Sequence, residues 1–142
     1  MISIIAFILL HSSKPIPAAV TSKITFPVYY PKGSPSSFTI AREQISYDET
    51  TTVLQMPATS SLSNHAATIS EQPLPGKLTF DQIKGEGTVI DGAKGQAAVS
   101  NVEGRMVAVM IDAGHKTLIL VNSTDASKEE LTAIVRSLDL LR

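Results

Sequence analysis

The chain has 142 residues and a mass of 15.1 kDa, which suits one domain with a short appendage. It contains no cysteine, which excludes disulfides, zinc–thiolate sites, iron–sulfur clusters and cysteine nucleophiles. Twelve Lys and Arg residues against thirteen Asp and Glu give a formal net charge of −1, so no overall field attracts nucleic acid.

The first ten residues, MISIIAFILL, are apolar except for Ser3. As a helix they would rise only ~15 Å, too short for a hydrocarbon core of ~30 Å. Their length matches the apolar part of a secretory signal, although no Lys or Arg precedes the run and no A-x-A exit follows it. The sequence therefore predicts an export signal or the remnant of a membrane anchor; the alternative is a buried strand or helix.

Residues 11–23 read HSSKPIPAAVTSK, and their two prolines favour an extended backbone. Such a stretch is typical of a tether between an anchor and a folded body. The predicted organisation is an apolar signal or anchor remnant with a Pro-rich tether over 1–23, and a single domain over 24–142.

Apolar residues alternate over 24–30, which predicts a strand, and Pro27 places it at a sheet edge or a strand start. The prolines and Gly33 in 31–35 predict a turn. Further strands are predicted over 38–40, with an extension toward 44–47, over 51–56 and over 66–72, with a loop over 57–64.

The glycine-rich part of the chain predicts short strands and turns. Residues 78–84 fit either one helical turn or a loop. Residues 89–90 and 96–100 read as strands joined by the turn dipeptide Asp91-Gly92. The richest apolar runs, 105–112 and 116–122, predict a central antiparallel hairpin.

The C-terminal segment predicts an amphipathic helix. Ser127 and Glu130 form an S-x-x-E capping box, and one apolar stripe follows: Leu131, Ile134, Val135, Leu138 and Leu141.

Strands followed by a terminal helix predict an α+β domain: an antiparallel sheet of about six to eight strands with the C-terminal helix packed on one face. The alternative is an all-β fold with the helix as a lid. The predicted core is Phe26, Val28, Phe38, Ile40, Val53, Leu54, Ile69, Val107, Val109, Ile111, Leu118, Leu120, Leu131, Ile134, Val135 and Leu138.

No motif in the chain predicts catalysis. The glycines of 85–95 lack the Gly-Lys-Ser/Thr of a phosphate loop and read as turn residues, and neither a G-x-S-x-G elbow nor H-E-x-x-H occurs. His11, His65 and His115 have no partner at metal-ligand spacing. Asp112 precedes His115 by three residues, which fits a weak divalent-ion site less well than two exposed turn residues. We expect no catalytic, cofactor or metal residues, and no enzyme.

A partner surface is the one site that the sequence indicates. Tyr29 and Tyr30 are adjacent, so on a strand one faces inward and the other outward. An outward tyrosine beside Pro31 suits a recognition groove. Tyr29, Tyr30 and Pro31 are therefore the candidate partner surface.

Three stretches together resemble a known family: F-P-V-Y-Y-P over 26–31 with Pro35 and Phe38 after it, E-Q-P-L-P over 71–75, and E-E-L-T-A-I-V-R-S-L over 129–138. Over 24–141 the chain resembles the uncharacterised extracytoplasmic domains of the DUF4367 type, and is similar to membrane-anchored proteins of candidate bacteria such as Saccharibacteria. The resemblance implies a domain that follows a single membrane-spanning helix, and it attaches no catalytic residue. The family's frequent tryptophan in the penultimate strand is replaced here by residues 109–111.

These observations predict a non-enzymatic domain on the extracytoplasmic side, exported or tethered to a membrane by its N-terminal segment. It would bind or sense a protein or a small ligand, and no nucleic acid. The alternative is a carrier or chaperone-like module that holds an apolar ligand between sheet and helix, in a cavity lined by Met106, Met110 or Leu141.

Overall fold

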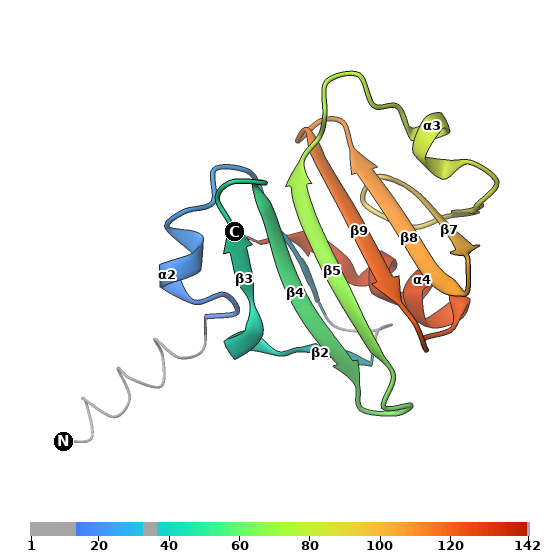
Figure 1. Cartoon of the computed structure of the whole chain (residues 1–142), viewed down its shortest axis with the longest axis horizontal. Coiled ribbons are helices and arrows are strands. Elements are labelled where there is room, and N and C mark those ends of the chain that lie inside the picture. The colour runs from blue at the N-terminus through green and yellow to red at the C-terminus, as the bar shows by residue number, and fades with distance from the viewer. Residues whose placement is uncertain (1–13, 33–36, 142) are drawn as a thin grey trace.

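The computed structural model describes residues 14–32 and 37–141, so the predictions for the apolar run 1–10 and for the centre of the turn at 31–35 lie outside the described residues. The described strands are β1 Tyr29–Pro31, β2 Phe38–Ile40, β3 Ser46–Asp48, β4 Val53–Ser60, β5 Ala66–Pro73, β6 Thr88–Ile90, β7 Gln96–Val102, β8 Arg105–Asp112, β9 Thr117–Ser123 and β10 Leu138–Leu140. The helices are α2 Ala18–Thr21, α3 Phe80–Lys84 and α4 Lys128–Ser137, with a 3₁₀ turn at Arg42–Gln44 (Figure 1).

An eight-stranded antiparallel sheet forms the body of the molecule. Its order is β2-β4-β5-β9-β8-β7-β6, and β3 lies beside the other half of β4. Figure 1 shows α4 behind this sheet. The predicted α+β class, strand number and C-terminal helix on one face are confirmed, and so is the central hairpin, now β8–β9.

Helix α4 begins and packs as its sequence indicates. The Ser127 side chain accepts from the Glu130 backbone N–H, and the Glu130 side chain accepts from the Ser127 backbone N–H. Four side chains of the predicted apolar stripe are fully buried: Leu131, Ile134, Val135 and Leu138. The predicted helical stripe to Leu141 is wrong at its end, because the helix stops at Ser137 and Leu138 begins β10. The helix lies against β7, β8, β9 and β1, so its stripe fills the space over the sheet.

The strand predicted over 24–30 is shorter than expected, and it is an edge strand of a small sheet of its own. Only Tyr29–Pro31 is a strand, and it pairs antiparallel with β10 in a separate two-stranded ribbon. Pro27 lacks the N–H that a longer ladder would need, and Val28 continues the pairing through its carbonyl, which accepts from the Leu141 N–H. The β1–β10 ribbon contacts α4, on the side of the sheet that the helix covers.

The prediction of a loop over 57–64 is wrong for its first four residues, because β4 continues to Ser60. Pro57 is tolerated inside a strand because it lies where the neighbour of β4 changes. β3 pairs with 53–55 and β2 with 58–60, so the missing N–H falls between two ladders. The Pro57 carbonyl accepts from the Ala41 N–H in the connection between them.

The predicted core contains residues from both faces of the sheet. On β8 and β9 the side chains toward α4 are Ala108, Met110, Ile119 and Val121, all buried. On the opposite face Val109, Ile111 and Leu118 are buried as predicted, whereas Val107 and Leu120 are half-buried. Both faces of β8 and β9 are apolar, so the period-two pattern could not show which face the helix covers. The predicted core therefore contained the face away from α4.

The packed body begins earlier than the predicted boundary at residue 24. Ile16 is buried within the hydrophobic core, and the Arg42 Nε donates to the Lys14 carbonyl at 2.6 Å. The predicted extended tether is wrong here, because residues 14–16 are bends that lead into the short helix α2. Residues 14–23 are therefore part of the folded surface.

Candidate functional site

Tyr29 joins the β1–β10 ribbon to the main sheet through both of its polar ends. Its backbone N–H donates to Glu71 Oε1 on β5 at 2.7 Å. Its hydroxyl donates to Asp112 Oδ2 at the end of β8. The Tyr29 side chain is fully buried, and its bonds to these two carboxyl groups hold the ribbon against the main sheet. We refer to Tyr29, Glu71 and Asp112 as the Tyr29 clamp.

Glu71 is the most unusual member of the clamp. It is fully buried on β5, an interior strand of the sheet, and its Oε2 has no hydrogen-bond partner among the described residues. Burial raises the pKa of the Glu71 carboxyl from 4.5 to about 8, although the Tyr29 N–H acts in the opposite direction. Glu71 is therefore neutral over most of the physiological range.

The electrostatics of Tyr29 and Asp112 follow from the same packing. Burial raises the pKa of the Tyr29 hydroxyl, and so do its bond to Asp112 and the nearby carboxyl groups of Glu71 and Asp139. Burial would also raise the pKa of Asp112, but hydrogen bonds from Tyr29 and His115 outweigh it and lower that pKa. Asp112 is therefore the ionised acceptor of the clamp.

The sequence did place Asp112 near His115, and the structure brings them together: the His115 Nδ1 lies 2.9 Å from Asp112 Oδ2. Within the described residues, no group of three or more His, Cys, Asp and Glu side chains could hold a metal ion. The pair instead belongs to the β8–β9 turn, where the His115 N–H also bonds to Asp112.

The three residues of the candidate partner surface lie differently from one another. Tyr29 is the inward tyrosine and is fully buried, so it cannot contact a partner. Tyr30 and Pro31 are half-buried and reach the surface. Sequence analysis did not single out Glu71 as a site residue, yet the alternation Ala67, Ile69, Glu71 already placed its side chain on the core face of β5.

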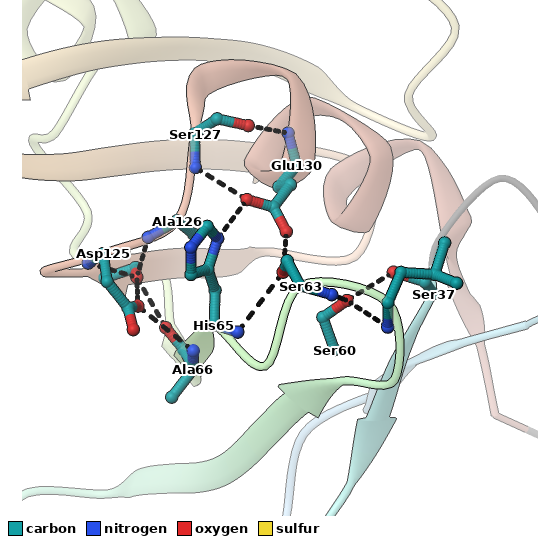
Figure 2. Close-up of polar contacts among 11 residues, drawn as sticks. Ser37, Ser60, Ser63, His65, Ala66, Asp125, Ala126, Ser127 and Glu130 are labelled. Atoms are coloured by element: carbon teal, nitrogen blue, oxygen red, sulfur yellow. Dashed lines mark hydrogen bonds and ion pairs between the residues drawn. The ribbon is translucent and has the colours of Figure 1, made fainter.

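A second polar cluster ties the β4–β5 loop to the start of α4 (Figure 2). The Glu130 carboxylate accepts from the Ser63 hydroxyl at 2.6 Å, lies 2.7 Å from the His65 Nδ1, and accepts from the Ser127 N–H at 3.0 Å. Although Ser, His and Glu are together, the glutamate lies between the other two. A hydrolase triad needs the histidine in that position, so this cluster is a structural connection.

The Glu130–His65 pair predicts a window of pH in which the loop connection is strongest. Three hydrogen bonds, from Ser63, Ser127 and His65, lower the pKa of Glu130 from 4.5 to about 2 against the effect of burial. The hydrogen bond to Glu130 raises the pKa of His65 above 6.5. A lowered acid pKa gives stability that is lost as the pH falls from 4.5 toward 2, and a raised histidine pKa gives stability that is lost as the pH rises.

We therefore expect Glu130→Gln to lower the thermal midpoint most between about pH 5 and pH 6. The difference from the native chain should shrink toward pH 2 and also above the pH at which His65 loses its proton. Differential scanning calorimetry across pH measures it, with Glu129→Gln, the exposed neighbour, as the control. A difference that stays constant with pH would contradict this assignment.

A pocket of about 580 Å³ lies between the α3–β6 connection, the edge of β7 and β8, and the first turn of α4. Ile83, Val99, Val102 and Met106 give it apolar lining. Lys84 and Lys128 add two positive charges and Glu86 one negative charge. The Lys128 Nζ donates to the Thr88 hydroxyl at 3.1 Å, which holds the lysine across the pocket. We call this the β6 pocket.

The three residues named for an apolar carrier cavity do not share one space. Met110 is fully buried in the core under α4. Met106 lines the β6 pocket, whereas Leu141 lines a different pocket with Ile16 and Phe26.

The fold thus defines an α+β domain built on a broad antiparallel sheet, with a buried polar clamp and a ligand-sized surface pocket. No protein-family model matches the sequence, and comparisons with curated proteins and with solved structures gave no match. In the part of the chain that the structure describes, no helix has the length and apolarity needed to cross a bilayer.

Proposed function

We propose that this chain is a non-enzymatic domain on the extracytoplasmic side of a membrane, tethered through its N-terminal segment, that binds a small ligand in the β6 pocket. The apolar run 1–10 and the resemblance to DUF4367-type domains support the location. The pocket supports the binding role, because its volume falls within the ~300–1,000 Å³ of small-molecule sites.

The lining of the β6 pocket indicates which ligand it suits. Aliphatic side chains and Met106 favour an apolar body, and the ammonium groups of Lys84 and Lys128 favour a negative group at its end. Because Glu86 offsets one of these charges, the lining favours a single negative charge. The proposed ligand class is a medium-chain carboxylate or a similar anionic amphiphile.

The experiment compares octanoate with 1-octanol, which share the chain length but differ in charge. We expect octanoate to shift the amide NMR signals of residues lining the pocket, such as Val99, Ser100 and Asn101, at low millimolar concentration. The double substitution Lys84→Gln with Lys128→Gln should weaken octanoate binding by about tenfold, roughly 1.4 kcal/mol. Lys77→Gln with Lys94→Gln, two lysines outside this lining, is the matched control.

The outcomes separate the ligand class from the binding role. Equal binding of 1-octanol and octanoate in the β6 pocket would retain the site and remove the preference for anions. The absence of shifts around the pocket with both compounds would overturn the proposed binding site.

A further inference from the structure

We propose that the Tyr29 clamp is a proton-controlled latch, in which protonated Glu71 keeps the β1–β10 ribbon closed on the main sheet and loss of that proton favours its opening. The inference concerns a different part of the molecule from the β6 pocket and does not depend on ligand binding. It adds a regulatory element next to the segment that leads to the N-terminus.

The position of Glu71 carries the inference. The Glu71 side chain is fully buried where the ribbon meets β5, with Oε1 bonded to the Tyr29 N–H and Oε2 unpartnered among the described residues. A buried carboxyl group is tolerated far better when neutral than when charged. Opening the ribbon is the direct way to bring water to this carboxyl group, since the Tyr29 N–H is its described polar contact.

The Tyr29 N–H favours ionised Glu71, but burial opposes it more strongly, and the other charged groups nearby are carboxyl groups. Tyr29 on β1 presents an N–H to Oε1, and its hydroxyl is already committed to Asp112 on β8. Asp112 and Asp139, the latter on β10, are the other carboxyl groups near Tyr29. The nearby His115 bonds to Asp112 and not to Glu71. Ionised Glu71 would therefore add a third negative charge around one buried tyrosine.

The direction of the pH effect follows from linkage. In the closed form the pKa of Glu71 is about 8, whereas a carboxyl group hydrated by opening returns toward 4.5. Between these values the closed form holds the proton more tightly, so the ratio of open to closed ribbon rises by up to tenfold per pH unit. Above about pH 8 both forms are ionised and the ratio levels off.

Amide hydrogen exchange on the full chain tests the latch. Three amides report on the ribbon: Tyr29 N–H, Lys32 N–H, which bonds to the Ser137 carbonyl, and Leu141 N–H, which bonds to the Val28 carbonyl. We expect their protection factors to fall by up to tenfold per pH unit between about pH 5 and pH 8. At pH 8 they should be smaller than those of the central strand β9, because the ribbon opens without global unfolding.

Glu71→Gln should remove this pH dependence, because glutamine keeps the shape and cannot ionise. Glu129→Gln, at an exposed glutamate of α4 outside both the Tyr29 clamp and the β6 pocket, should behave like the native chain. An unchanged slope in Glu71→Gln, or ribbon protection equal to that of β9 at pH 8, would overturn the latch.

A direct titration covers the case in which Glu71→Gln does not fold. The ¹³C shift of the Glu71 carboxyl in the native chain should titrate with a midpoint near pH 8. A midpoint near 4.5 would mean that the closed ribbon already admits water to the carboxylate, and the proposal would fail.

Discussion

Replacing Leu138 with alanine is expected to lower the free energy of unfolding by about 2–5 kcal/mol, the range for truncating a large aliphatic core residue. Leu138 is fully buried at the point where α4 ends and β10 begins. Its truncation removes apolar contacts from the core cluster, and any cavity that remains adds to the loss. Urea denaturation followed by circular dichroism should show a clearly lower midpoint.

Arg136→Ala is the matched control for Leu138→Ala. Arg136 lies two residues earlier on the exposed side of α4, where its Nε donates to the Asp91 carbonyl. We expect a change within about 0.5 kcal/mol, as for most surface substitutions. An unchanged midpoint for Leu138→Ala would show that α4 is not docked on the sheet in solution.

Gly95→Ala is expected to destabilise the domain by about 1–3 kcal/mol, because overpacking forces the backbone to shift. A Cβ at this position would lie 2.4 Å from the Ile111 carbonyl oxygen and 2.9 Å from its carbonyl carbon. These atoms belong to the backbone of β8 and cannot rotate away as a side chain could. Thermal unfolding monitored by circular dichroism measures the loss.

Gly76→Ala tests whether the effect of Gly95→Ala comes from this close approach. A Cβ at Gly76 would meet no atom within 4 Å, and its backbone is not in the left-handed region. We therefore expect Gly76→Ala to be neutral or slightly stabilising, by up to about 1 kcal/mol, because alanine restricts the unfolded chain. Equal losses at both glycines would contradict the steric explanation.

The elements that could be predicted from the sequence are those whose signals are local. The Ser127–Glu130 capping box and the spacing of the apolar stripe are local signals, and they predicted the start and the buried face of α4 correctly. They did not predict its end, because Leu138 leaves the helix and pairs with the distant β1. The Asp91-Gly92 dipeptide likewise marked the turn between β6 and β7. In each case the residues that decide the structure are neighbours in the chain.

The features that could not be predicted depend on residues that are far apart in the sequence. Pro57 is typical of a loop. It fits inside a strand only because the neighbour of β4 changes from β3 to β2 at this position. The burial of Tyr29 depends on β5 and β8, and no local pattern pairs residue 29 with residues 71 and 112. The Tyr29 clamp therefore became visible only once the strands were placed in the sheet.

The β1–β10 ribbon has a consequence for the order in which the molecule folds. Its strands are distant in the chain: Lys32 Nζ bonds to the Leu140 carbonyl, 108 positions later. Closing so long a loop costs entropy. The three residue pairs between β1 and β10 offset this cost only after the intervening sheet has formed. We therefore expect the β4–β5 and β8–β9 hairpins to form early and Tyr29 to be enclosed last, so that the segment leading to the N-terminus is the final part of the domain to be secured.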